Sequence, residues 1–146
     1  MSKFSYKSKL RLRNEKAYIV DNGMATYHER NLATSNYGWR LENAIYIELL
    51  RRTSPLMQEI YCYRQTSRSP EVDFVVTDRG IVTELIQVSY NIDNEKTFNR
   101  EIKALVEAAA NTGCDNLILI TMDRTETVKS GDKTIKIVSA IDWLLN

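Results

Sequence analysis

The sequence predicts a single α/β domain with a core in the order αβββαβ, in which helices flank a mixed sheet. Two stretches with apolar residues at helical spacing, 37–52 and 95–112, predict the helices. Three strand-like stretches lie between them, of which 70–78 is rich in β-branched residues, and the almost wholly apolar stretch 116–123 follows the second helix. A length of 146 residues with an apolar fraction of 43% is that of one ordinary globular domain.

Residues 1–36 are expected to form a basic arm, a short strand at 17–21 and a loop. Residues 37–146 are expected to form the core together with a C-terminal extension. The sequence AYIVD predicts the strand, and Asn22-Gly23 is a turn dipeptide that ends it. The first sixteen residues hold six basic side chains against one acidic side chain, a net charge of +5. Such an arm can bind phosphate, although a solvated terminus is the commoner explanation.

The first helix of the core is predicted at 37–52, because Ile45 and Leu49 belong to an apolar stripe at helical spacing. Pro55 ends this helix, since the residue before a proline avoids the α region. Strands are then expected at 59–65, 70–78 and 80–90. Gly80, between the last two of them, suits the turn of a hairpin.

The second helix is predicted at 95–112, with Ile102 and Leu105 on its apolar face. Asp93 or Asn94 can cap its first turn, and Gly113 suits its end. The remaining elements are expected to be a strand at 116–123, a polar loop at 124–132, a strand at 133–139 and a helical turn at 140–146.

The cysteine and histidine content excludes several kinds of site. Cys62 and Cys114 form no CxxC pair and lie in apolar or strand-like surroundings, where a buried free thiol is expected. The single histidine, His28, is expected at the surface or in a loop. A structural zinc site and a histidine-based catalytic triad therefore receive no support.

The hydropathy pattern favours a cytoplasmic protein with no membrane partner. No apolar run is long enough to cross a bilayer, and the N-terminus lacks the apolar core of a signal peptide. The sequence contains no GxxxxGK[ST] motif, so the chain carries no P-loop for ATP.

Polar residues interrupt the apolar elements at three places, and these are the candidates for chemistry. Asp73 lies within the apolar stretch Val72–Val76, where a carboxylate is costly unless it is paired, bound to metal or open to a cleft. Gln87 is a similar interruption of the neighbouring strand, and Glu42 borders the apolar stripe of the first helix. These three side chains can converge at one site, which suits Mg²⁺ binding and hydrolysis of a phosphodiester.

An ordered set of six stretches resembles a known family. They are KAYIVDNGMA, WRLENAIYIELLRR, PEVDFVV, ELIQVSY, NREIKAL and IDWLL. The chain is similar to the C-terminal domain of prokaryotic AAA+ ATPases, a domain of unknown function placed in the PD-(D/E)XK superfold of restriction-endonuclease-like proteins. The resemblance spans nearly the whole chain and implies an αβββαβ core. It also implies an AAA+ ATPase domain, missing from this chain, as a partner, and exposed residues meant for that domain could promote self-association.

The resemblance implies a role for each candidate residue. Glu42, Asp73 and Gln87 match the positions that hold the catalytic Mg²⁺, and the acidic-X-lysine motif of active members falls on Gln87-Val88-Ser89. Gln87 is neutral and can bind a metal only weakly through its carbonyl oxygen. Ser89 replaces the lysine that would help to orient the attacking water and stabilise negative charge. The catalytic set, Glu42, Asp73, Gln87 and Ser89, is therefore degenerate.

Other residues could supply the missing charges. Glu84 could provide a carboxylate, but period-two alternation places it on the opposite face of its strand. Lys96, Arg100 or Lys103 on the second helix could provide a cation, and Arg100 is the best placed of them. If nucleic acid binds, the basic side chains expected to contact it are Arg100, Lys9, Arg11 and Arg13.

The sequence leaves several functions open. The first is a DNA-associated, nuclease-like module with weak or absent hydrolysis, and the alternative is a non-catalytic interaction domain that regulates a partner ATPase. An active Mg²⁺-dependent endonuclease is a third, weakened by the missing lysine. A purely structural interpretation also stands, in which Asp73 pairs with Arg40 or Arg64 and Glu42 contacts Tyr46.

Overall fold

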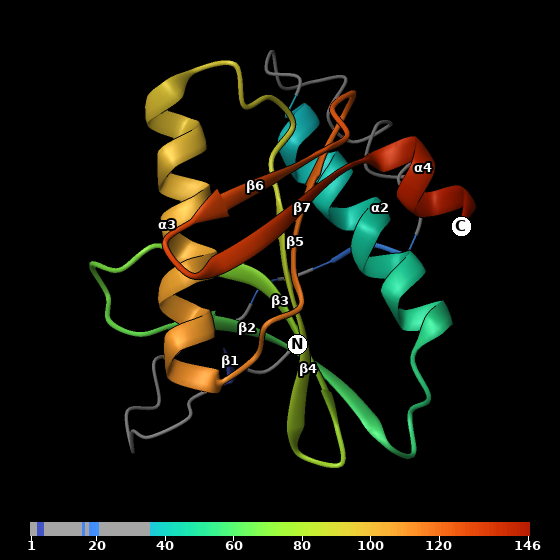
Figure 1. Ribbon diagram of the computed structural model, residues 1–146. Coiled ribbons are helices and arrows are strands. Elements are labelled where there is room, and N and C mark those ends of the chain that lie inside the picture. Colours follow the sequence, from blue (N-terminus) through green and yellow to red (C-terminus); the bar gives the residue numbers. More distant parts are fainter. Residues whose placement is uncertain (1–2, 5–15, 17, 21–35) are drawn as a thin grey trace.

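The computed structural model describes residues 3–4, 16, 18–20 and 36–146 (Figure 1). The helices are α2 (Tyr37–Arg52), α3 (Glu95–Thr112) and α4 (Ala140–Leu145). The strands are β1 (Lys3–Phe4), β2 (Gln58–Arg64), β3 (Glu71–Asp78), β4 (Ile81–Val88), β5 (Leu117–Thr121), β6 (Glu126–Ser130) and β7 (Lys133–Ser139). The order α2, β2, β3, β4, α3, β5 confirms the predicted αβββαβ core.

The strands form one mixed sheet in the order β1-β2-β3-β4-β5-β7-β6. The hairpins β2–β3, β3–β4 and β6–β7 are antiparallel. The neighbours β4–β5 and β5–β7 are parallel, as is the short β1 beside β2. Parallel neighbours need a crossover connection, and α3 provides it between β4 and β5.

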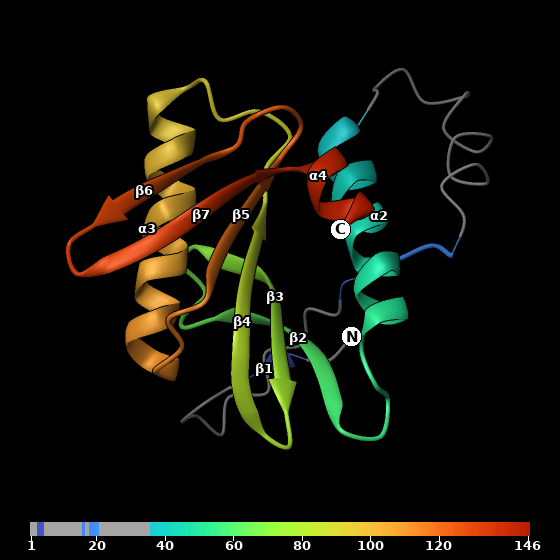
Figure 2. The same ribbon diagram turned by 45° about the vertical axis from the view of Figure 1, so that its right-hand side comes forward.

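Helices cover both faces of the sheet, with α3 on one side and α2 and α4 on the other (Figure 2). On the α3 side, Leu105 packs with Leu85 and Leu119 in one buried cluster. On the α2 side, Ile45 packs with Phe74 in a second cluster. Because both faces are covered, the central strands are apolar almost throughout, as the sequence of β5 indicates.

The predicted caps and turns are confirmed where local chemistry determines them. The Asn94 side chain accepts hydrogen bonds from the first turn of α3, and Gly113 ends that helix with a left-handed φ of 73°. Arg79 and Gly80 both have positive φ, 50° and 80°, which suits the tight hairpin between β3 and β4. Cys62 and Cys114 are buried free thiols, as expected.

The polar loop predicted at 124–132 is wrong, because this segment contains strand β6. β6 forms a hairpin with β7 at the edge of the sheet, and Gly131 turns the chain with a φ of 61°. Most of its side chains are exposed or half-buried, so its polar composition reflects an edge position and not a loop.

The strand predicted at 17–21 is wrong for Tyr18, Ile19 and Val20, which belong to no strand. The backbone N–H of Ile19 donates to the side-chain oxygen of Asn43 at 2.8 Å, and the Asn43 amide donates to the Ile19 carbonyl at 2.8 Å. A side chain of α2 thus bonds the backbone groups that a neighbouring strand would bond. Asn43 is fully buried, and these two hydrogen bonds satisfy its side-chain amide.

Candidate functional site

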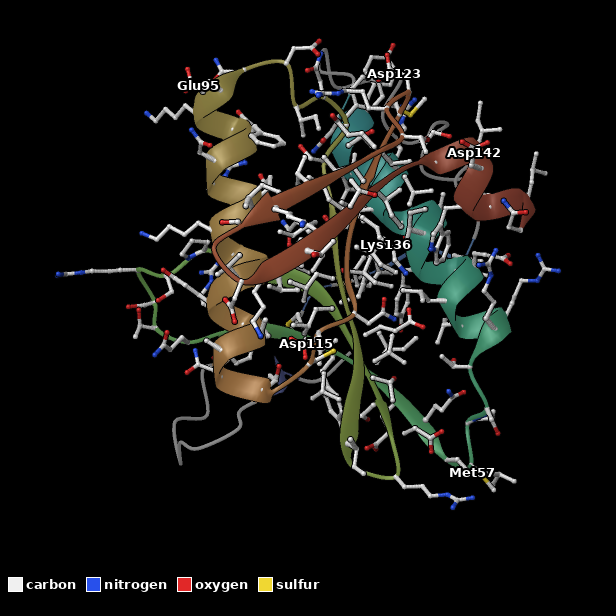
Figure 3. The ribbon with its side chains drawn as sticks, in the orientation of Figure 1. Met57, Glu95, Asp115, Asp123, Lys136 and Asp142 are labelled. Carbon is white, nitrogen blue, oxygen red and sulfur yellow. The ribbon has the colours of Figure 1, made fainter. Side chains whose placement is uncertain are left out.

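A cleft of about 540 Å³ opens where β4 ends and α3 begins. It is bordered by the first turns of α2, the start of β3, the end of β4 and the first half of α3. In Figure 3, Glu95 at the start of α3 marks this end of the molecule, and Met57 lies at the opposite end. The cleft is lined by several of the residues that the sequence singles out, Glu42, Asp73, Gln87, Ser89 and Arg100.

Asp73 lies where β3 and β4 separate. The backbone pairing of the two strands reaches Phe74 and Ile86, and beyond that point side chains make the cross-strand bonds. The Asp73 N–H donates to Oε1 of Gln87 at 3.1 Å, and the Val88 N–H donates to Oδ2 of Asp73 at 3.0 Å. Both side chains are buried, so this exchange fixes their orientation at the floor of the cleft.

Gln87 is also bonded on its donor side. Its Nε2 donates to Oε2 of Glu101 at 2.7 Å, and Glu101 is itself buried at 4% exposure. Arg100, whose side chain is 64% exposed, donates to the other oxygen of the same carboxylate. A neutral donor at position 87 is what a buried carboxylate on α3 requires, which explains why this position holds an amide.

Lys16 supplies a cation that the sequence analysis did not anticipate. Its Nζ lies 2.9 Å from Oε1 of Glu42, 2.8 Å from Oε1 of Glu71 and 2.7 Å from Oδ1 of Asp73. The predicted ion pair of Asp73 is thus made with Lys16, whereas Arg64 pairs with Glu71 at 2.7 Å. The only signal in the sequence was that Lys16 opens one of the stretches that carry the family resemblance.

The residues beside Lys16 hold it against α2. The Tyr18 hydroxyl donates to Oε1 of Glu42 at 2.7 Å, and its ring stacks on Tyr46 at a centroid distance of 4.1 Å. The exchange between Ile19 and Asn43 fixes the backbone one residue further on. Glu42 is therefore tied to Tyr18 and Lys16, and Tyr46 serves as the platform for the Tyr18 ring.

The electrostatics of the cleft follow from burial and crowding of charge. Burial, and then the negative charge of Glu42, raise the pKa of Asp73 to about 7, against the lowering effect of Lys16 and the Val88 N–H. Burial lowers the pKa of Lys16, but the carboxylates of Asp73 and Glu42 outweigh it and leave that pKa above its ordinary value. Burial and Glu42 raise the pKa of Tyr18, so its phenol stays protonated.

With Lys16 in place, the residues of the cleft do not fit the Mg²⁺ that the family resemblance implies. One oxygen of each of Glu42, Glu71 and Asp73 accepts from the ammonium group, and the carbonyl oxygen of Gln87 accepts from a backbone N–H. Over the described part of the chain, no group of three or more His, Cys, Asp or Glu side chains is arranged to hold a metal ion. Mg²⁺ requires several free oxygens in near-octahedral geometry.

The other predicted side chains fall inside and outside the cleft. Ser89 lines it, and its hydroxyl donates to the Asn91 carbonyl at 3.2 Å. Burial raises the pKa of Glu84, and the positive charges of Arg52 on α2 and Lys136 on β7 lower it. This carboxylate therefore lies near α2 and β7. Lys103 is 67% exposed and pairs with Glu107 on the surface of α3. Some predicted residues lie outside the described residues, namely Lys9, Arg11, Arg13 and His28.

Besides Lys16, the sequence analysis did not assign three other charged residues to the cleft, Glu71, Arg64 and Glu101. Glu71 precedes Asp73 by two positions, so strand alternation could have placed both on one face. Arg64 was considered only as a partner of Asp73. Glu101 gave no signal, because a glutamate in an amphipathic helix is ordinarily a surface residue.

Comparison with known protein families gives a match over most of the chain. A family model with the description "Domain of unknown function (DUF4143)" matches residues 37–141, which is more than half of the chain. No curated protein and no solved structure matches the chain. Among the described residues, no helix is both long and apolar enough to cross a membrane.

Proposed function

We propose, for a chain that belongs to the family described as domain of unknown function DUF4143, a role as a DNA-associated module with a degenerate phosphodiesterase site. The observation that carries the proposal is the meeting of Glu42, Asp73 and Gln87 in one cleft. They come from three different elements, α2, β3 and β4; Asp73 and Gln87 interrupt apolar strands, and Glu42 borders the apolar stripe of its helix. Such convergence of polar groups in a cleft is the usual mark of a binding or catalytic site.

Three features make turnover at this site unfavourable. Gln87 is neutral and fully engaged by Asp73 and Glu101. Ser89 offers no positive charge to a developing phosphorane. The ammonium group of Lys16 is shared among carboxylates and is not free to orient water. The site therefore favours binding without hydrolysis.

The rim of the cleft offers groups that suit nucleic acid. The rings of Tyr37 and Tyr90 stack at 5.5 Å and are both exposed, at 51% and 40%. The guanidinium carbon of Arg40 lies 5.9 Å from the centre of the Tyr37 ring. Aromatic faces stack on bases, and cations such as Arg100 contact phosphates. The fold thus brings Tyr90 and Arg100, which are ten residues apart in the sequence, to the same cleft.

The family resemblance implies that such a module forms the C-terminal domain of an AAA+ ATPase. The alternative function is a non-catalytic domain that regulates the partner ATPase. It is favoured by α4, which exposes Ile141 at 60% and Leu145 at 82%. Exposed apolar residues of this kind suit burial against a protein partner, either a second copy of the chain or an ATPase domain.

The test is fluorescence anisotropy with labelled single- and double-stranded DNA at several salt concentrations. We expect binding that weakens with salt, because phosphate contacts release counterions. Arg100→Ala and Tyr90→Ala should each weaken it roughly five- to tenfold, which corresponds to about 1 kcal/mol or slightly more. Arg79→Ala is the matched control, since Arg79 is 74% exposed in the hairpin at the far end of β3.

Plasmid DNA incubated with Mg²⁺ should remain uncut in the same experiments. Absence of any salt-dependent DNA affinity would refute the proposal and favour the regulatory alternative. In that case Ile141→Ser should alter self-association in light scattering while leaving the fold intact.

A further inference from the structure

The position of Lys16 is the most unexpected feature of the cleft. Its Nζ contacts carboxylates from two elements, Glu42 on α2 and Glu71 and Asp73 on β3, at 2.7–2.9 Å. A divalent cation held by the same oxygens would occupy the same region, because carboxylates that share one cation must point toward one centre. The ammonium group therefore stands where a divalent cation held by these three carboxylates would stand.

The carboxylates need a cation at this place. Their side chains are largely buried, with exposures of 19% for Glu42, 15% for Glu71 and 10% for Asp73. Like charges in a poorly solvated site repel strongly unless a positive charge lies among them. Arg64 neutralises Glu71 from one side, and Lys16 is the cation among the described residues that contacts all three carboxylates.

The contact is held by a set of bonds and not by a single surface ion pair. Lys16 lies 26 residues before Glu42 and 57 before Asp73 in the chain, so the approach is a tertiary one. Tyr18 bonds Glu42 and stacks on Tyr46, and Asn43 bonds the backbone of Ile19 on both sides. These contacts fix Lys16, Tyr18 and Ile19 against α2 and bring the ammonium group to the carboxylates.

We infer that Lys16 is the resident cation of this cleft, and that a divalent cation can bind Glu42 and Asp73 only by displacing it. The inference concerns the same cleft as the proposed function but does not depend on nucleic acid. It explains how Asp73 and Glu42 can stand close together as largely buried carboxylates. The cleft is then a cation site with a protein side chain as its occupant.

The test is calorimetric titration of the full chain with Mn²⁺ alone, on wild type, Lys16→Met and Lys16→Arg. Methionine keeps much of the length of the lysine side chain but removes the charge, whereas arginine keeps the charge. We expect Lys16→Met to bind Mn²⁺ at least about tenfold more tightly than wild type or Lys16→Arg, because it leaves anionic oxygens without a cation. Adding Asp73→Asn to Lys16→Met should abolish this gain.

Equal Mn²⁺ affinity in wild type and Lys16→Met would overturn the inference, whether both bind tightly or neither binds. Mg²⁺-dependent plasmid cleavage by wild type that Lys16→Met abolishes would also overturn it, by showing a catalytic lysine. Loss of DNA affinity alone would count against the proposed function and leave this inference standing.

Thermal unfolding of the same variants decides the matter if Lys16→Met is too unstable to titrate. If Lys16 neutralises Asp73, the effects of the two substitutions on stability are strongly coupled. Adding Asp73→Asn to Lys16→Met should then recover much of the melting temperature that Lys16→Met loses. Lys16→Arg should remain close to wild type. Additive losses in the double variant would show that Lys16 and Asp73 act independently, and would overturn the inference.

Discussion

Asp73 shows at the scale of one residue how burial sets the chemistry of the cleft. Its carboxylate sits among apolar strand residues with 7% exposure, and burial is the largest cause of its raised pKa. The Val88 N–H and Lys16 stabilise the ionised form but do not fully compensate for the lost hydration. Asp73 is therefore a group that gains or loses its proton near neutral pH.

This raised pKa predicts a dependence of stability on pH. The folded-state pKa of about 7 lies above the ordinary value of 3.8, so the folded state binds the proton more tightly than the unfolded state. The contribution of Asp73 to stability is thus present below about pH 4 and is lost as the pH rises to about 7, by at most about 4 kcal/mol.

Urea denaturation of wild type and Asp73→Asn at pH 5 and pH 8 measures this effect. Wild type should lose stability between the two values, and Asp73→Asn should lose much less, since it has no proton to release. The raised pKa of Lys16 keeps that residue charged throughout this window. Identical pH dependence in the two proteins would contradict the prediction.

At the scale of elements, the sequence predicted what local signals determine. The ends of α2 and α3 follow from Pro55, Asn94 and Gly113, whose effects act within a few residues. β6 was missed because an edge strand exposes polar side chains and so resembles a loop in composition. Residues 18–20 were misassigned because their bonding partner, Asn43, lies on a helix 24 residues away from Ile19.

The β6–β7 hairpin gives a prediction at this scale. Gly131 has a φ of 61°, a conformation that costs an L-residue about 1 kcal/mol. Gly131→Ala should therefore lower the free energy of unfolding by roughly 1 kcal/mol, even though no atom lies within 4 Å of the added methyl group.

Gly38→Ala is the matched control for Gly131→Ala. Gly38 lies in the first turn of α2, where the nearest atom to the added methyl group is an Asn36 side-chain oxygen at 3.8 Å. Alanine favours helix there, so this variant should be neutral or slightly more stable. Equal effects of the two substitutions in chemical denaturation would show that backbone strain at the hairpin is not the cause.

At the scale of the whole molecule, only part of the site could be predicted. Glu42, Asp73 and Gln87 could be grouped because Asp73 and Gln87 interrupt apolar strands, Glu42 borders an apolar stripe, and the element order brings α2, β3 and β4 together. Lys16 and Glu101 could not be placed, because each looks like an ordinary charged residue in the sequence. Their roles depend on the distances between segments far apart in the chain.

The cleft is therefore a network in which the identity of residue 87 depends on its neighbours. Gln87→Glu supplies the acidic residue that the family resemblance implies at this position but places its carboxylate against Glu101, to which Gln87 Nε2 now donates at 2.7 Å. We expect this variant to lose about 3 kcal/mol of stability at pH 8, because two buried carboxylates would share one site.

Adding Glu101→Gln to Gln87→Glu should recover most of that loss. The donor and acceptor then exchange places, and the new carboxylate at position 87 accepts from both the amide at 101 and the Asp73 N–H. Urea denaturation of the two single variants and the double variant measures the coupling between them. A double variant as unstable as Gln87→Glu would show that the contact with Glu101 does not set the identity of residue 87, and that the neutral motif has another cause.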